Sequence, residues 1–285
     1  MAVDLHTHSS ESDGTDRPST LIAKADSLGL VAVALTDHDT LAGIAEAQRA
    51  ADASSIDLVP GTELSVTWPT GKMHLLVLFL EPGSGPLQDR LAGLRDGRTV
   101  RNEKIIGRLR SLGYPLTMDD VLEHAGGEAV GRPHIADALI ERGHFANRAE
   151  AFETLLGDGR PAYVERRRLT AHEAIRLARE SEALTSIAHP YTVGVSRDDY
   201  GRAFAELAAE GLTAIESHHT EHAPELRDHL AVIAADLGLL TTGGSDYHGA
   251  GKEGVELGRG RGDLDVPNEF FFRLQAARAG LGDPD

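Results

Sequence analysis

The chain has 285 residues, of which 41% are hydrophobic, and this composition predicts one large folded domain or a barrel with an insertion. A formal net charge of -17 argues against a broad nucleic-acid or anionic-membrane surface, because both partners would be repelled. The absence of cysteine excludes disulfides, thiolate metal sites and a cysteine nucleophile. The sequence contains no signal-peptide pattern and no membrane-spanning window, so a soluble, cytoplasmic protein is expected.

Hydrophobic runs alternate with amphipathic helical patterns through residues 1–85. Pro18 stands where a helix would begin, and Gly29 ends that pattern. The continuous apolar run that follows indicates a strand buried on both faces, as in a parallel sheet. The expected strands here span residues 2–5, 30–35 and 73–80, with a short one before Gly61, and the expected helices span 18–28 and 41–53.

The pattern changes at the break Pro82-Gly83-Ser84-Gly85-Pro86, beyond which no convincing strand occurs up to Arg168. Helices are expected there at 87–112, 119–124, 133–141 and 147–156. Strand–helix alternation then resumes, with helices at 170–181, 199–210 and 224–237, strands at 183–188, 213–217 and 239–242, and a short C-terminal helix. We therefore predict an α/β barrel formed by residues 1–85 and 169–285, with residues 86–168 inserted as a helical cap.

Residue types that bind metal ions stand at or near the ends of the predicted strands. His6 and His8 follow the first strand, and positions i and i+2 of a strand point to the same face. Singly, each such residue is readily explained as a hydrogen-bonded polar residue or a turn residue. Together they would be costly to bury without a countercharge, which divalent metal ions supply. The nine candidates are His6, His8, Asp13, His38, Glu63, His74, His189, Asp246 and His248.

The order of the motifs H-T-H, S-D-G, T-D-H, G-x-E, a later lone His, A-H-P and S-D-x-H resembles that of the polymerase-and-histidinol-phosphatase (PHP) family of metal-dependent phosphoesterases. The resemblance covers nearly the whole chain and implies a distorted (β/α)7 barrel of the PHP type with a trinuclear metal centre. It also implies a ligand set for each metal ion: His6, His8, Glu63 and Asp246 for the first, Glu63, His74 and His189 for the second, and Asp13, His38 and His248 for the third.

Imidazole and carboxylate ligands suit Mn²⁺, Fe²⁺ or Zn²⁺, and we expect three divalent ions, with Mn²⁺ the favoured metal. A bridged metal pair lowers the pKa of a shared water, and the resulting hydroxide would attack phosphorus. The expected catalytic residues are Glu63, Asp246 and His248, with Asp246 or His248 guiding a proton to the leaving oxygen. Asp37 is expected to orient a neighbouring ligand.

Two basic motifs in the insertion, R-x-x-R-N and G-R-P-H, are suited to phosphate, which arginine binds in a bidentate manner. Such a cap resembles the family branch that acts on nucleoside 3′,5′-bisphosphates and short RNA 5′ ends. We therefore predict removal of the 3′-phosphate from a nucleoside 3′,5′-bisphosphate by a metal-activated hydroxide. The expected substrate contacts are Arg98, Arg101, Asn102, Arg132, His134 and His38. The expected partner is a small nucleotide or short oligonucleotide, with no membrane, no long nucleic-acid track and no obligate protein partner.

The same metal centre would equally serve a cyclic phosphodiesterase acting on a phosphorylated sugar, a histidinol phosphatase or a 5′-3′ exoribonuclease on short RNA. An amidohydrolase barrel also opens on H-x-H, although the A-H-P and S-D-x-H motifs favour phosphoester chemistry. A non-catalytic metal-binding module is the alternative from a different class, and it would be expected to lack some ligands. A further cluster, His218, His219 and His222, also follows a predicted strand, so one of the three could line the pocket. Because nine ligands are already supplied elsewhere, an exposed loop is expected for this cluster.

Overall fold

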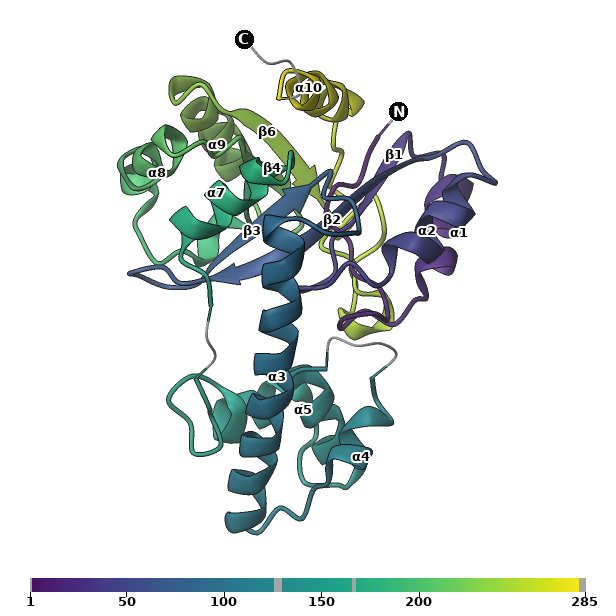
Figure 1. The fold of residues 1–285 in the computed structure, drawn as a ribbon, viewed down its shortest axis with the longest axis vertical. Helices are drawn as coiled ribbons and strands as arrows, with labels where there is room; N and C mark the ends of the chain where they lie inside the picture. Colours follow the sequence, from purple (N-terminus) through teal and green to yellow (C-terminus); the bar gives the residue numbers. More distant parts are fainter. Residues whose placement is uncertain (1, 126–129, 166–167, 282–285) are drawn as a thin grey trace.

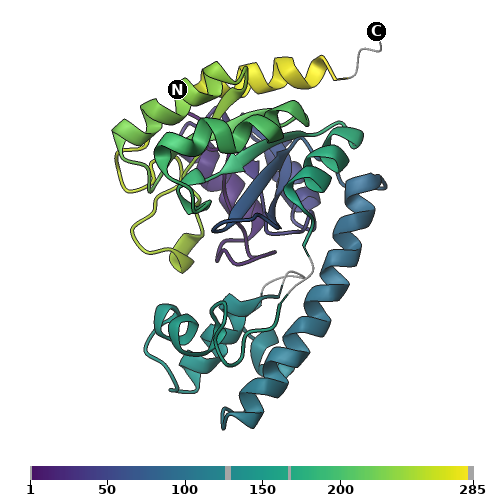
Figure 2. The same cartoon turned by 90° about the vertical axis from the view of Figure 1, so that its left-hand side faces the viewer.

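The computed structural model describes residues 2–125, 130–165 and 168–281 (Figure 1). The upper part in Figure 1 is a mixed sheet with helices around it, and the lower part is helical. The long helix α3 (Pro86–Ser111) runs from one part into the other, and the turned view in Figure 2 shows the same arrangement. We call residues 86–168 the helical part and the rest the barrel part.

A six-stranded sheet in the order β1-β2-β3-β4-β5-β6 forms the centre of the barrel part. Its strands are β1 (Ala32–Leu35), β2 (Asp57–Val66), β3 (Met73–Leu78), β4 (Leu184–Ala188), β5 (Ala214–His219) and β6 (Leu240–Gly244). The pairs β1/β2, β4/β5 and β5/β6 are parallel, whereas β3 is antiparallel to both of its neighbours. The reversal follows from the connection at 67–72, which contains no helix and is too short for a parallel crossover.

The N-terminal segment 2–8 links the two edge strands of this sheet. The backbone N–H of Asp4 donates to Ala32 of β1 at 3.1 Å, and that of Leu5 donates to Gly243 of β6 at 3.0 Å. The segment makes isolated bridges rather than the continuous strand expected at 2–5. Because residues 2–8 contact both edges, the sheet curls into a barrel-like form. The predicted α/β barrel class is thereby confirmed.

Helices surround the barrel sheet, namely α1 (Pro18–Ser27), α2 (Ile44–Ala51), α7 (Ala171–Glu180), α8 (Tyr200–Ala209), α9 (Pro224–Asp236) and α10 (Asn268–Ala279). The predicted cap of α7 is present, because Thr170 Oγ1 accepts from the backbone N–H of Glu173 at 3.1 Å. The Glu173 carboxylate accepts in return from the backbone N–H of Thr170 at 2.9 Å. No helix among the described residues is long and apolar enough to cross a membrane.

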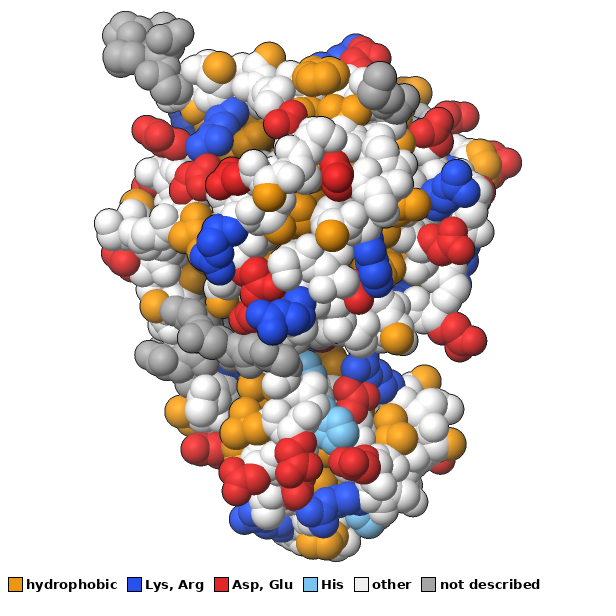
Figure 3. All heavy atoms as spheres, turned by 90° about the vertical axis from the view of Figure 1, so that its right-hand side faces the viewer, with side chains coloured by type: hydrophobic (Ala, Val, Ile, Leu, Met, Phe, Trp, Pro, Cys, Tyr) orange, Lys and Arg blue, Asp and Glu red, His pale blue; other side chains and the backbone are white. Residues whose placement is uncertain are grey.

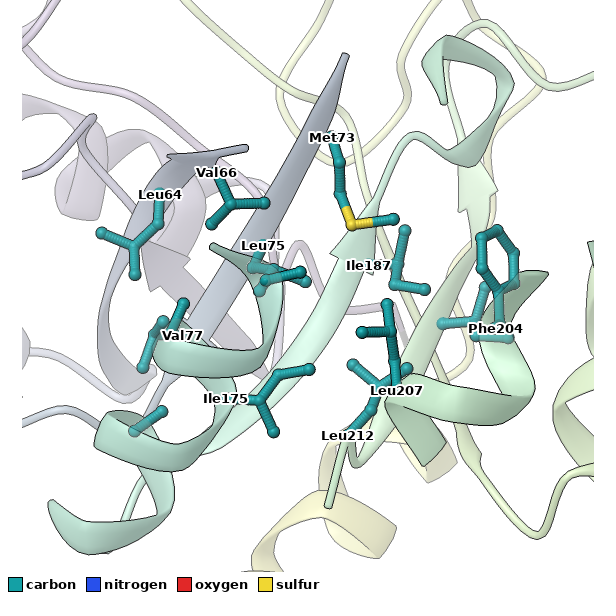
Figure 4. Packing of buried hydrophobic residues seen from close by; sticks show 14 of the residues in the cluster. Leu64, Val66, Met73, Leu75, Val77, Ile175, Ile187, Phe204, Leu207 and Leu212 are labelled. Carbon is teal, nitrogen blue, oxygen red and sulfur yellow. The ribbon is translucent and has the colours of Figure 1, made fainter. Parts of the chain in front are cut away.

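The main hydrophobic core lies between one face of the sheet and the helices α7, α8 and α9. Figure 4 shows Leu75 of β3, Ile187 of β4 and Phe204 of α8 within it. These side chains are fully buried, which explains why the strands read as nearly continuous apolar runs. The core therefore fixes the strands rigidly, and with them the side chains at their ends.

The helical part has a hydrophobic cluster of its own, which includes Ile105, Leu109, Leu139 and Leu155. Besides α3 it contains α4 (Met118–Leu122), α5 (Arg132–Glu141), α6 (Arg148–Ala151) and a π-helical turn (Phe152–Leu156). The single helix expected at 147–156 is thus divided between α6 and this turn. The remaining expected helices of the segment occur within a few residues of their predicted bounds.

Candidate metal centre

All nine predicted ligands lie together at one edge of the barrel sheet. His38 follows β1 and forms a parallel bridge with Glu63 of β2, and His189 directly follows β4. The carboxyl ends of parallel strands meet at one edge, so residues that end different strands converge there. His74 stands at the start of β3, but the antiparallel direction of this strand places it opposite Ala188, at the end of β4.

Glu63 occupies the middle of the centre, and its two carboxylate oxygens face different histidines. Its Oε1 lies 2.7 Å from His74 Nδ1 and 2.8 Å from His189 Nε2. Its Oε2 lies 3.3 Å from His8 Nε2 and 3.1 Å from His38 Nδ1. A carboxylate arranged in this way can contact one ion through each oxygen.

Asp246 and Asp13 face the remaining histidines. Asp246 Oδ1 lies 3.4 Å from His6 Nε2 and 3.3 Å from His8 Nε2. Asp13 Oδ1 lies 3.2 Å from His248 Nε2. Each of the three predicted ligand sets is therefore brought together by the fold.

Several buried ring nitrogens at the centre indicate that the residues fit metal ions. His6 Nε2 and both ring nitrogens of His8 are buried and have no hydrogen-bond partner among the described residues. Leaving such atoms unpaired is costly. Ligand atoms around one ion with bonds of ~2.1 Å lie roughly 3.0–3.4 Å apart, which is close to the separations of His6 and His8 from Asp246 Oδ1. A divalent ion would satisfy these nitrogens.

The centre holds its carboxylates ionised without metal. Burial favours the neutral form of Glu63, but the neighbouring imidazoles outweigh it, and the pKa of Glu63 is well below its usual range. Burial favours the neutral ring of His8 as well, but contacts with Asp246 and Glu63 prevail and raise the pKa of His8 to about 10. Burial lowers the pKa of His38 to about 4. In the metal-free protein, protonated histidines thus supply part of the positive charge.

Two of the predicted ligands have an unusual backbone conformation. His189 has φ 29° and Asp246 has φ 54°, both in the left-handed region that residues other than glycine rarely adopt. Such conformations cost energy and persist only where the surrounding structure imposes them. Here the buried strands β4 and β6 lead directly into these residues, so the fold maintains the orientation of both side chains.

Glu216 and His219 of β5 also reach the centre; Glu216 was not predicted to do so, and for His219 an exposed loop was favoured over a place in the pocket. The prediction of an exposed loop is wrong for His219, whose side chain is fully buried. A bulge between Glu216 and His218 lets β5 extend to His219. Glu216 Oε1 accepts from His6 Nδ1 at 3.0 Å, and its Oε2 accepts from the backbone N–H of His189 at 2.6 Å. The only sequence signal for Glu216 was its position as a single acidic residue within a predicted apolar strand.

The other two histidines of that cluster belong to none of the ligand-type groups found among the described residues. His218 packs against Phe270, with ring centroids 5.2 Å apart. His222 is buried rather than exposed, and its Nδ1 donates to the carbonyl of Ser217 at 2.8 Å. The exposed-loop prediction is therefore wrong for His222 as well.

Asp37 holds the loop between the predicted ligands His8 and Asp13. Its carboxylate accepts from the backbone N–H of Ser9 at 2.8 Å and from the hydroxyl of Ser12 at 2.5 Å. This loop carries the predicted ligand Asp13, so Asp37 holds the segment that positions Asp13, and its orienting role stays a prediction.

Two adjoining cavities open at the centre. One, of about 280 Å³, lies over the ligands and is also lined by Arg148 and Lys252. The other, of about 220 Å³, lies between the barrel and helical parts. Asp13, His38 and His74 line both cavities. On the face drawn in Figure 3, histidine and basic side chains are visible near the junction of the two parts.

The second cavity is rich in cationic side chains. The predicted substrate contacts that line it are Arg98, Arg101, Arg132, His134 and His38, and Lys72 and Arg168 join them. Asn102 is not among the described residues that line the two cavities: it is buried, and its amide donates to the carbonyl of Val130 at 2.9 Å. Asn102 therefore stabilises the helical part, and its role as a substrate contact stays a prediction.

Known proteins resemble this chain over most of its length. The PHP domain family matches residues 4–95. The chain is 32% identical over 258 residues to the 5′-3′ exoribonuclease Rnm of Salmonella typhimurium, which covers 90% of this chain and 88% of that relative. It is 30% identical over 257 residues to the 3′,5′-nucleoside bisphosphate phosphatase of Chromobacterium violaceum, with 90% of each covered. A candidate metal-dependent phosphoesterase from Bifidobacterium adolescentis superposes with a TM-score of 0.85 at 33% identity, covering 96% of this chain and 95% of that one.

The chain therefore belongs to the PHP family. It is a metal-dependent phosphoesterase, that is, an enzyme that hydrolyses phosphoric esters. The predictions of the family, of the PHP-type fold and of the reaction class are confirmed.

Proposed function

We propose that this enzyme removes the 3′-phosphate of nucleoside 3′,5′-bisphosphates. The observation that carries the proposal is the pair of adjoining cavities that share Asp13, His38 and His74. One molecule can place a phosphate over the ligands and a second phosphate in the cationic cavity. Cavities of about 280 and 220 Å³ suit a small ligand. The name of the C. violaceum relative agrees with this substrate.

The proposed centre contains three divalent ions, with Mn²⁺ as the metal. The division of the Glu63 oxygens between two groups of histidines supports a bridging role for this residue. When bound, the ions supply an activated water and neutralise charge on the phosphoryl oxygens. The proposed ligands are the nine predicted residues, His6, His8, Asp13, His38, Glu63, His74, His189, Asp246 and His248.

Residues 86–168 are proposed to act as a cap that binds the second phosphate. The guanidinium of Arg132 lies 5.3 Å from the ring centroid of Tyr163, and its Nη1 donates to the carbonyl of Leu156 at 2.9 Å. These contacts hold the planar group in place for bidentate binding. His134 Nδ1 accepts from the backbone N–H of Gly131 at 3.0 Å, so its neutral ring carries the proton on Nε2 and can donate.

Arg98 connects this cap to the barrel. Its guanidinium contacts the carboxylate of Asp39, which follows His38 directly. Both side chains of the pair are buried, so the contact ties the position of α3 to that of a proposed ligand. The catalytic roles of Glu63, Asp246 and His248 stay predictions, as do a cytoplasmic location and the absence of an obligate partner.

A 5′-3′ exoribonuclease acting on short RNA is the second candidate. The Salmonella relative with 32% identity carries that name. The same two cavities would accept a terminal nucleotide that carries a 5′-phosphate, with the ester to the next nucleotide at the metal centre. The net charge of -17 disfavours a long nucleic-acid track in either case.

A comparison of substrates tests the proposal. Metal-stripped protein restored with Mn²⁺ is assayed on a nucleoside 3′,5′-bisphosphate, a 5′-phosphorylated dinucleotide, a cyclic sugar phosphate and histidinol phosphate. The highest kcat/KM is expected for the bisphosphate, with phosphate as the product. A higher kcat/KM for any other substrate would overturn the assignment.

The Arg132→Ala variant tests the second phosphate site. Loss of a charge-assisted contact of about 1.5–3 kcal/mol predicts a KM for the bisphosphate roughly 10–100-fold higher. A nucleoside 3′-monophosphate should show little change. Arg142→Ala is the matched control, because Arg142 occupies the C-cap position of α5, lines neither cavity and pairs with Asp120. An unchanged KM for the bisphosphate in Arg132→Ala would contradict the assignment.

A further inference from the structure

Two nitrogen atoms face the oxygen of Asp246 that lies opposite neither His6 nor His8. Lys252 Nζ lies 2.7 Å from Asp246 Oδ2, and His219 Nε2 lies 3.5 Å from the same oxygen. The other oxygen, Oδ1, faces the ring nitrogens of His6 and His8. The two oxygens of this carboxylate therefore have different surroundings.

The tautomer of His219 follows from its second ring nitrogen. The backbone N–H of Glu221 donates to His219 Nδ1 at 3.0 Å, so the lone pair resides on Nδ1 and the neutral ring carries its proton on Nε2. His219 Nε2 is buried and has no hydrogen-bond partner among the described residues, and the carboxylate oxygen that faces it is Asp246 Oδ2 at 3.5 Å. A nitrogen that carries a proton cannot bind a metal ion. Although His219 lies close to His6 and Glu216 in a ligand-like group, it is a donor and not a fourth-site ligand.

Neighbouring side chains restrict the ring of His219. The ring of Tyr191 lies 5.8 Å from it and that of His222 lies 5.1 Å from it, measured between centroids. His222 is held in turn by its hydrogen bond to Ser217. The direction in which His219 Nε2 points is thus set by packing.

We propose that His219 and Lys252 are positioning residues, which hold Asp246 Oδ2 so that Oδ1 is presented to the metal ion. The inference rests on the proposed role of Asp246 as a ligand. A carboxylate with both oxygens free could rotate or bind through either oxygen, whereas two donors on Oδ2 select one orientation. Outer contacts of this kind typically change metal affinity 10–100-fold.

The test measures Mn²⁺ binding to the metal-free protein by calorimetry, without substrate. In His219→Phe, which removes the donor, affinity should fall roughly 10–100-fold with the number of bound ions unchanged. His219→Gln should restore most of the affinity, because the glutamine amide can place a donor near the position of Nε2. In His219→Phe, kcat should recover to the wild-type value at high Mn²⁺, while the KM for the bisphosphate stays constant. His218→Phe is the matched control, because the adjacent His218 packs against Phe270 and lies away from the centre.

Wild-type affinity in His219→Phe would overturn the proposal. Loss of one bound ion in both His219→Phe and His219→Gln would also overturn it, because that result would make His219 a ligand. If His219→Phe does not fold, Lys252→Met carries the test, since Lys252 is partly exposed, and a 10–100-fold loss of affinity is again expected. Because metal binding is measured without substrate, a wrong bisphosphate assignment would leave these results unchanged.

Discussion

Replacing Glu216 with glutamine should weaken metal binding although Glu216 is not itself a proposed ligand. The carboxylate is fully buried and accepts two hydrogen bonds, from His6 Nδ1 at 3.0 Å and from the backbone N–H of His189 at 2.6 Å. Since the proton of His6 resides on Nδ1, its Nε2 is free to bind a metal ion. Glu216 therefore selects the tautomer of one ligand and fixes the backbone of another.

A glutamine amide cannot make both of these contacts. If its oxygen accepts from His189, its NH₂ group faces His6 Nδ1, and the proton of His6 must move to Nε2, where it blocks the metal. If the amide is reversed, two donors oppose each other at His189. An orienting partner of a metal ligand is typically worth 10–100-fold in affinity, which corresponds to about 1.4–2.7 kcal/mol.

The assay is calorimetric titration of Mn²⁺ into metal-free wild type and Glu216→Gln, with thermal unfolding of the metal-free proteins to verify the fold. Glu225→Gln is the control, because Glu225 is exposed in the first turn of α9, which packs on the same strand. An affinity of Glu216→Gln within about twofold of the wild type would refute the tautomer argument.

Two further predictions concern protons and packing at the centre. Burial opposes the charge of His8, but Asp246 and Glu63 raise its pKa to about 10, so metal binding near pH 7.5 should displace a proton and Mn²⁺ affinity should rise with pH up to about 10. Calorimetry in buffers of different ionisation enthalpy counts the released protons, and a buffer-independent enthalpy would contradict the prediction. Gly244→Ala should destabilise the fold by about 1–3 kcal/mol or more, because a Cβ there would lie 2.4 Å from the backbone nitrogen of His6. Gly201→Ala, with open space around it, should keep wild-type stability in the same denaturant titration.

The sequence by itself determined the barrel class, most helix and strand positions and the nine candidate ligands. These features follow from local patterns, because apolar runs, capping residues such as Thr170 and the short motifs at strand ends act over a few neighbouring residues. The motif order then identified the family, which the relatives confirmed.

Only the tertiary structure decided which further side chains meet at the centre. Glu216 and His219 lie on a buried strand, and whether a polar residue there faces the metal centre or the helices depends on the bulge and register of β5. The direction of β3 likewise decided that His74 joins ligands from the ends of other strands. The side chain of Asn102, in the motif R-x-x-R-N, hydrogen-bonds to Val130 within the helical part, because packing sets the side-chain directions on α3. Such long-range choices depend on contacts between residues far apart in the chain, so the pattern around each residue does not encode them.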